Sequence, residues 1–153
     1  MNESGNKPNL IDLYRQYNNF GRELGMDFTI VRPGEIEYRL TIEEKHLSTP
    51  RAAHGGVIAA LMDGLLGVAG LSVVYEEGKV LSTVEFKINF LNPALLHDKL
   101  IGRAKVDQRG KRILVISGDI IVANRDNIVI AKALGTFNAY PAEKAGILLA
   151  NSD

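Results

Sequence analysis

The chain has 153 residues, of which 46% are hydrophobic, and its 18 basic and 18 acidic residues give no net charge. This length fits one domain with a substantial core, and the balanced charge favours neither nucleic acid nor a membrane surface as a partner. Cysteine is absent, which excludes disulfides, thiolate metal sites and a cysteine nucleophile and is consistent with a cytoplasmic location.

The first half of the chain predicts a helix, two strands and a second, much longer helix. Residues 1–9 are polar, lack the layout of a signal peptide and are expected to be flexible. Apolar residues at helical spacing predict a helix over 10–24 that ends at Gly25. Phe28 and Ile30 then lead into a turn at 32–35, and alternating apolar residues predict a strand over 36–42.

The most informative segment runs from His54 to Gly70. It is apolar apart from His54 and Asp63, and it begins with Gly55 and Gly56. A membrane span rarely carries a central aspartate, so we expect a buried helix of a soluble protein. Large residues such as Met62 are expected to belong to its core rather than to a ligand pocket.

The second half predicts strands throughout. Apolar and polar residues alternate over 83–90, and further strands are expected at 100–106, 113–123 and 128–137. The segments 108–111 and 124–127 have the composition of hairpin turns. The fold class is therefore α+β, with an antiparallel sheet wrapped around one long central apolar helix. A single domain over 10–140 and a C-terminal tail over 141–153 are expected.

Several motifs resemble those of one family. They are His54-Gly55-Gly56 with Asp63 nine residues after the histidine, the strand Val84–Ala94, the turn Arg109–Arg112 and the closing strand Ala133–Phe137. In these residues the chain resembles hotdog-fold acyl-CoA thioesterases of the PaaI-like branch, related to the hydroxybenzoyl-CoA thioesterases. The resemblance implies hydrolysis of acyl-CoA thioesters, with aryl or medium-chain acyl groups, without a metal or a cofactor other than the substrate's own CoA.

Thioester hydrolysis needs an oxyanion site and an activated nucleophile, and this helix offers both. Backbone N–H groups at the start of a helix point outward, so the N–H of Gly55 or Gly56 is a candidate oxyanion donor. Asp63 is the candidate general base or nucleophile, since apolar surroundings make a carboxylate a stronger base. Alternatively, the glycines only let the helix begin in a crowded core, and Asp63 is a structural carboxylate that caps a partner helix or meets a buried arginine.

The spacing of these two groups predicts an oligomer. Gly55 and Asp63 are eight residues apart, which is roughly 12 Å along a helix, so one carbonyl cannot touch both. If both act, they come from different subunits whose helices run antiparallel about a two-fold axis. We therefore expect a homodimer with the site at the subunit interface, in agreement with what the family resemblance implies. The complete assembly is expected to be a dimer of dimers.

Three further residues are candidates for the reaction. His54 either contacts the thioester or holds the loop before the helix, and Thr83 resembles the family's small hydroxyl residue that helps hold the attacking water. Six residues before His54 the family usually has Asn or Gln on the thioester carbonyl, whereas this chain has Ser48, a weaker donor or a simple loop residue. Three residues before His54, where the family favours glycine, this chain has Arg51. These departures leave the rate and the substrate open.

Two segments are candidates for binding the CoA part of the substrate. The strand end with Phe90, Asn92, Pro93 and Ala94 resembles the edge of the family's pantetheine tunnel. The turn at 109–112 could pair with the CoA phosphates, although basic turns are commonly just solvated. Its residues are Arg109, Gly110, Lys111 and Arg112. No metal site is expected, because the three histidines show no ligand spacing with acids.

Two other functions remain open at this point. Hotdog hydratases and dehydratases share the fold but place a catalytic histidine and acid differently. A non-catalytic acyl-CoA-binding or sensing protein is the second alternative, and the serine at position 48 gives it some weight.

Overall fold

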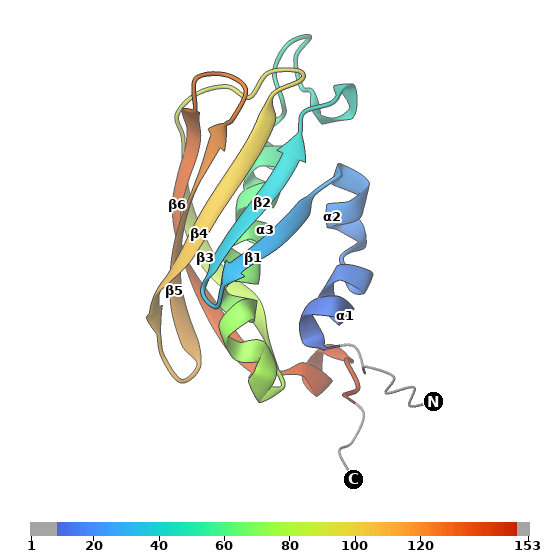
Figure 1. Cartoon of the computed structure of the whole chain (residues 1–153), viewed down its shortest axis with the longest axis vertical. Coiled ribbons are helices and arrows are strands. Elements are labelled where there is room, and N and C mark those ends of the chain that lie inside the picture. The colour runs from blue at the N-terminus through green and yellow to red at the C-terminus, as the bar shows by residue number, and fades with distance from the viewer. Residues whose placement is uncertain (1–8, 150–153) are drawn as a thin grey trace, which may run out of the picture.

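The structure is a computed structural model that describes residues 9–149. The helices are α1 (Leu10–Tyr17), α2 (Asn19–Leu24) and α3 (Gly55–Val74). The strands are β1 (Asp27–Arg32), β2 (Glu35–Thr41), β3 (Lys79–Phe90), β4 (Lys99–Arg109), β5 (Ile113–Val122) and β6 (Ile128–Pro141) (Figure 1). Short 3₁₀ turns lie at Glu44–His46, Tyr75–Glu77 and Ala142–Ala145. The flexible segment predicted at 1–9 lies outside the described residues, except for Asn9.

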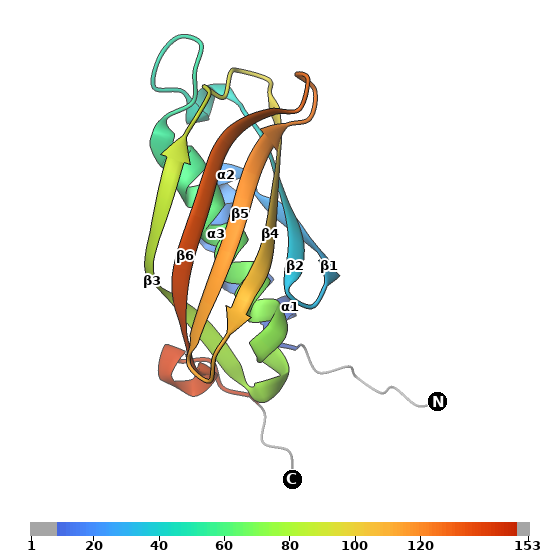
Figure 2. The same ribbon diagram turned by 90° about the vertical axis from the view of Figure 1, so that its left-hand side faces the viewer.

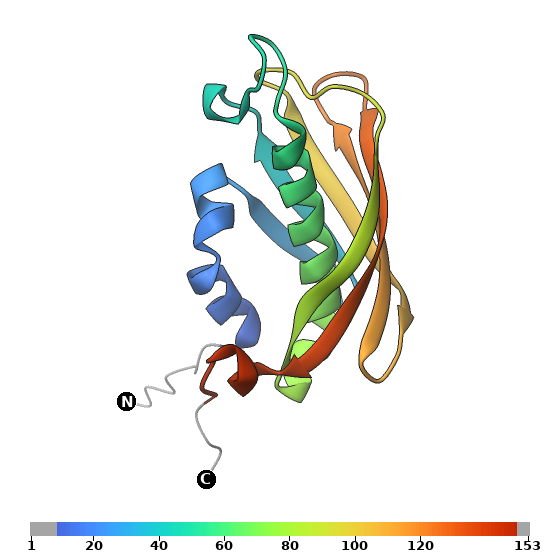
Figure 3. The same cartoon turned by 180° about the vertical axis from the view of Figure 1, so that it is seen from behind.

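The six strands form one antiparallel sheet in the order β1-β2-β4-β5-β6-β3 (Figure 2). Helix α3 lies along one face of this sheet, and α1 and α2 lie on the other side of α3 (Figure 3). The predicted α+β class, with one antiparallel sheet around a single long helix, is confirmed.

Helix α3 is buried against the sheet along most of its length. Leu61, Met62, Leu65 and Leu66 are fully buried, as predicted for core residues. The segment Gly55–Glu77 is long and apolar enough to cross a membrane, but 67% of its most apolar window is buried inside the protein. Its hydrophobicity is thus explained by packing against strands.

The N-terminal helix differs from the prediction, because it is two helices that meet at Asn18. The Asn18 side chain accepts a hydrogen bond from the Gly21 N–H and so caps α2, which interrupts the apolar periodicity over 10–24. Gly25 ends α2 in the left-handed conformation, as expected for a C-terminal glycine. The last strand is longer than predicted, since β6 runs past 128–137 to Pro141, and a 3₁₀ turn follows it.

A β-bulge in β3 changes which side chains face the helix. Thr83 pairs with Phe137 and Glu85 pairs with Thr136, so Val84 is the extra residue. Leu81 and Phe86 both pack against the core, although strict alternation would place them on opposite faces. The alternation in the sequence also predicted that Thr83 and Phe86 face opposite sides of the strand. The bulge instead turns Thr83 toward α3, where it meets Asp63.

Candidate active site

Asp63 lies half-buried in the middle of α3, beside the bulge of β3. The Thr83 hydroxyl donates a hydrogen bond of 2.7 Å to Asp63 Oδ1. Within residues 9–149 Asp63 forms no ion pair, so the alternative of a carboxylate paired with a buried arginine is not what this structure has. The second carboxylate oxygen has no protein donor in the described part of the chain and is free to accept a proton.

A cavity of about 170 Å³ adjoins Asp63. Glycines form its wall on α3, apolar side chains of β3 and β6 form other walls, and Tyr14 of α1 contributes a phenol. The lining residues are Tyr14, Asp63, Gly64, Gly67, Leu71, Val80, Leu81, Thr83 and Phe137. The candidate acid thus borders a small, mostly apolar pocket that is partly open to solvent.

Tyr14 is a site residue that the sequence reasoning missed. Its helical spacing correctly marked it as an inward-facing residue, but nothing in the sequence linked α1 to the middle of α3. Burial, the neighbouring Tyr38 and the charge of Asp63 all raise the pKa of Tyr14 well above its ordinary value. Tyr14 is therefore a neutral phenol at every physiological pH and can only donate or accept a hydrogen bond.

The start of α3 distinguishes the two candidate oxyanion donors. His54 is the N-cap residue, and its Nδ1 accepts a hydrogen bond of 2.7 Å from the Gly56 N–H. The Gly55 N–H has no acceptor among residues 9–149. Gly55 is therefore the glycine whose N–H remains available. When neutral, His54 carries its proton on Nε2, because Nδ1 is the acceptor.

A groove of about 380 Å³ runs beside this free N–H. The segment predicted to bind pantetheine forms much of it, together with the start of α3. The lining residues are Ala53, Gly55, Ile58, Phe90, Leu91, Asn92, Pro93 and Ala94. The structure thus brings the predicted CoA-binding segment and Gly55 together.

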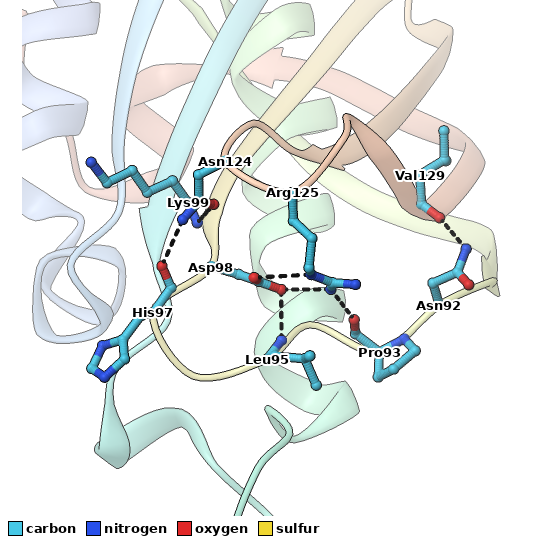
Figure 4. A network of polar contacts seen from close by, with 9 residues as sticks. All are labelled: Asn92, Pro93, Leu95, His97, Asp98, Lys99, Asn124, Arg125 and Val129. Carbon is cyan, nitrogen blue, oxygen red and sulfur yellow. Dashed lines mark hydrogen bonds and ion pairs between the residues drawn. The ribbon is translucent and has the colours of Figure 1, made fainter.

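A polar network holds this segment in place (Figure 4). The Arg125 guanidinium binds Asp98 through Nε and Nη2, at 3.2 and 2.7 Å, and donates to the Pro93 carbonyl at 2.9 Å. The Leu95 N–H also donates to Asp98, and the Asn92 side chain donates to the Val129 carbonyl. The β5–β6 turn therefore fixes the backbone that lines the groove.

Asp98 is ionised in this network. Its burial would raise the pKa, but the hydrogen bonds from Arg125 and the Leu95 N–H outweigh burial, and the pKa lies below its ordinary value. No feature of the sequence pattern pointed to this pair, which joins residues 27 positions apart.

Ser48 lies in an exposed turn before α3. Its N–H donates to the Ala52 carbonyl, and the Thr49 hydroxyl accepts from the Ala52 N–H, so the backbone and Thr49 hold the turn. The Ser48 hydroxyl itself makes no hydrogen bond within the described residues. It is free for a ligand, but the structure gives it no contact with Asp63 or Gly55.

Comparison with known proteins identifies the family. Residues 52–128 match the model of the thioesterase superfamily, and this stretch contains His54, Gly55, Asp63 and Thr83. The chain belongs to the thioesterase superfamily. It is 30% identical over 103 residues to human acyl-coenzyme A thioesterase 13, covering 67% of this chain and 72% of the relative.

Solved structures agree with this assignment. A thioesterase family protein from Silicibacter pomeroyi superposes with a TM-score of 0.77 and 27% identity, covering 86% of this chain and 95% of that one. The Escherichia coli PaaI protein of the phenylacetic acid degradation operon shares the fold, with a TM-score of 0.73 and 20% identity over 85% of this chain and 90% of that one. The predicted resemblance to hotdog-fold acyl-CoA thioesterases is confirmed, and the PaaI structure shows the same fold.

The basic turn at 109–112 lies far from the groove within one chain. The turn joins β4 and β5 at the end of the sheet opposite the start of α3 (Figure 2). Arg109 forms an ion pair with Glu77, just beyond the C-terminal end of α3, and Arg112 contacts Asn138 at 3.4 Å. Lys111 is exposed. A single subunit therefore does not bring the two predicted CoA-binding segments together.

The histidines of the thioesterase have different surroundings. His46 is buried, where Nδ1 accepts from the Glu43 N–H and Nε2 bonds the Leu24 carbonyl, so it ties the loop to α2. His54 caps α3, and His97 is exposed with a φ of 73°. In the described part of the chain, no three histidine or acidic residues cluster as metal ligands do.

Proposed function

We propose that this protein hydrolyses acyl-CoA thioesters to the free acid and CoA, with Asp63 as general base or nucleophile. The observation that carries the proposal is the position of Asp63: it is held by Thr83 and borders an apolar cavity that can receive an acyl group. The thioesterase superfamily and the human acyl-coenzyme A thioesterase support the substrate class.

The active site forms between two subunits in this proposal. Strand β3 is a twelve-residue edge of the sheet, and its Val84 and Phe90 side chains are 58% and 55% exposed. A long edge strand that exposes apolar side chains favours pairing with another chain. Antiparallel pairing of two β3 strands about a two-fold axis runs the α3 helices in opposite directions, which moves Gly55 of the partner subunit toward Asp63.

The same symmetry supports a path for CoA. A two-fold axis through the β3 edges exchanges the two ends of the sheet. The basic turn of one subunit then lies at the end where the other subunit has its groove beside Gly55. Pantetheine occupies the groove, and Lys111 and Arg112 of the other subunit meet the phosphates as charge-assisted partners.

The reaction follows from these positions. In the general-base route Asp63 takes a proton from water, whose oxygen attacks the thioester carbon. The carbonyl oxygen becomes an oxyanion that the Gly55 N–H of the partner subunit stabilises. The C–S bond then breaks, and the proton on Asp63 passes to the CoA thiolate. In the nucleophilic route Asp63 attacks the thioester carbon, the C–S bond breaks and CoA leaves as the thiolate. Water then hydrolyses the resulting anhydride to the free acid and the Asp63 carboxylate, and the proton released passes to the thiolate.

The test is release of free thiol from a panel of acyl-CoA thioesters, for the wild type and Asp63→Asn. Asparagine keeps the shape and can still contact Thr83 but is neither a base nor a nucleophile, so kcat is expected to fall about a hundredfold or more. Asp119→Asn, which replaces a carboxylate on the outer face of the sheet, is the control and is expected to retain activity. Wild-type turnover in Asp63→Asn contradicts the role of Asp63.

The same panel separates the two alternatives. A protein that binds acyl-CoA in calorimetry but releases no thiol from any of them is a binding or sensing protein. Enoyl-CoA substrates, followed by loss of the conjugated double bond, detect a hydratase. Either outcome without thiol release overturns the proposal.

A further inference from the structure

Helix α3 contains three glycines in its interior, at positions 64, 67 and 70. Glycine is the poorest helix former apart from proline, so each of these positions weakens the helix unless a side chain would do harm there. The structure shows which glycines packing requires and which it does not.

Packing explains Gly70 but not the other two glycines. A Cβ atom on Gly70 would lie 2.2 Å from Leu81 Cδ1 and 2.8 Å from Ile116 Cδ1, so both core side chains would have to move. A Cβ atom on Gly67 would meet only Phe137 Cε1 at 3.7 Å, and one on Gly64 would meet Tyr38 no closer than 3.5 Å. Both are ordinary contact distances, so alanine fits at positions 64 and 67.

The feature that Gly64 and Gly67 share is the cavity beside Asp63. Both line it, one and four residues beyond the acid. Its volume of about 170 Å³ is similar to that of an engineered apolar cavity of about 150 Å³ that binds benzene in another protein. A methyl group on either glycine would shrink this space without a clash.

We propose that Gly64 and Gly67 keep open an acyl pocket behind Asp63, and that Gly67 sets the largest acyl group that the pocket admits. This inference rests on the proposed thioesterase activity, because the acyl group enters the cavity only when the thioester lies at Asp63. At about 170 Å³ the pocket has room for short acyl chains or a single aromatic ring.

The test compares Gly67→Ala, which narrows the pocket, with Val80→Ala, which widens it. Thiol release is measured for acetyl-, butanoyl-, hexanoyl-, octanoyl- and phenylacetyl-CoA. For Gly67→Ala, kcat/KM of the largest group that the wild type accepts is expected to fall about tenfold or more, since one carbon in an apolar pocket discriminates on that scale. Acetyl-CoA hydrolysis is expected to fall less than hydrolysis of the larger groups, so the ratio of the two kcat/KM values reports the size of the pocket. Val80→Ala is expected to shift the preference toward larger groups.

Thermal unfolding supplies an independent readout. Because alanine fits and favours the helix, the melting temperature of Gly67→Ala is expected to equal or exceed that of the wild type. A clear fall in melting temperature would mean that packing already fills this space, and it would overturn the inference.

Binding of non-hydrolysable keto analogues of the same acyl-CoA series separates the pocket from the chemistry. If the wild type releases thiol and Gly67→Ala shows the same dependence of kcat/KM on acyl-group size, the pocket proposal is wrong and the thioesterase activity is still supported. If the wild type releases none, the hydrolase is wrong. The analogues then decide the pocket alone: weaker binding of only the larger groups by Gly67→Ala supports it, and unchanged binding overturns it.

Discussion

The Thr83 hydroxyl donates a 2.7 Å hydrogen bond to the Asp63 carboxylate, and a β-bulge makes this contact possible. Without the extra residue Val84, Thr83 would face the opposite side of the sheet from Phe86, away from α3. Bulges commonly re-aim a side chain next to an active site. Here the bulge places a hydroxyl on the acid that we assign to the chemistry.

Replacement of Thr83 by valine tests this contact. Valine has the same shape but no hydroxyl, so Asp63 loses its orienting donor. A hydrogen bond to a charged group contributes about 1.5–3 kcal/mol, and kcat is expected to fall about tenfold or more while KM changes little. Thr83→Ser, which keeps the hydroxyl, is the matched control and should stay near wild type. Equal losses in both variants would show that the methyl group, not the hydroxyl, matters.

A site shared between subunits predicts that two inactive variants restore each other. Gly55→Val blocks access to the free N–H, and Asp63→Asn removes the acid, so each homodimer should be inactive. In a mixed dimer, one of the two sites has both Gly55 and Asp63. An equal mixture at random exchange is expected to recover about a quarter of wild-type activity. No recovery, with exchange verified by differently tagged subunits, would rule out the shared site.

Ser48 can be tested by restoring the family's usual amide. Its hydroxyl has no partner within residues 9–149, so an asparagine there displaces no hydrogen bond of the turn. Ser48→Asn is expected to raise kcat/KM about three- to tenfold, the scale of one neutral hydrogen bond of about 0.5–1.5 kcal/mol. Ser48→Ala should lower it. Rates that fall in Ser48→Asn would mean that the site is arranged around serine.

The sequence predicted the fold because its patterns are local and strong. Helix α3 is apolar over its 20 residues apart from Asp63 and Ser72, and the turns before β2 and after β4 have typical turn composition. The helix break at Asn18 was missed because a capping side chain interrupted a continuous apolar periodicity. The bulge at Val84 was missed because both registers give a plausible alternation, and only packing against α3 selects one.

The sequence predicted the site residues that lie together on one segment. It did not predict the contacts between segments that are distant in the sequence. Asp63 and Gly55 share a helix with a recognisable motif, and their spacing alone argues for two subunits. The approach of Tyr14 to Asp63, and of Arg125 to Asp98, depends on tertiary packing that no local pattern encodes. The cavity between α1, α3 and β3 is a property of the fold, so its glycine wall became interpretable only in three dimensions.

The Asp98–Arg125 pair predicts how stability depends on pH. The pKa of Asp98 is lower in the folded protein than the value of about 3.9 in an unfolded chain. The contribution of this pair is therefore fully present above about pH 4 and is lost as the pH falls through the folded pKa. Asp98→Asn removes the charge, so the free energy of unfolding at neutral pH is expected to fall by about 2 kcal/mol, the scale of a charge-assisted hydrogen bond.

Below the folded pKa of Asp98 the wild type and Asp98→Asn should converge in stability, because the wild-type carboxyl is then neutral too. Urea unfolding across a pH series measures this difference. Asp126→Asn is the control, since Asp126 is exposed in the same turn with a φ of 52°, which asparagine tolerates. It should stay within about 0.5 kcal/mol of wild type. If the difference in free energy of unfolding between wild type and Asp98→Asn stays the same in acid, the network depends on the shape of the side chain and not on its charge.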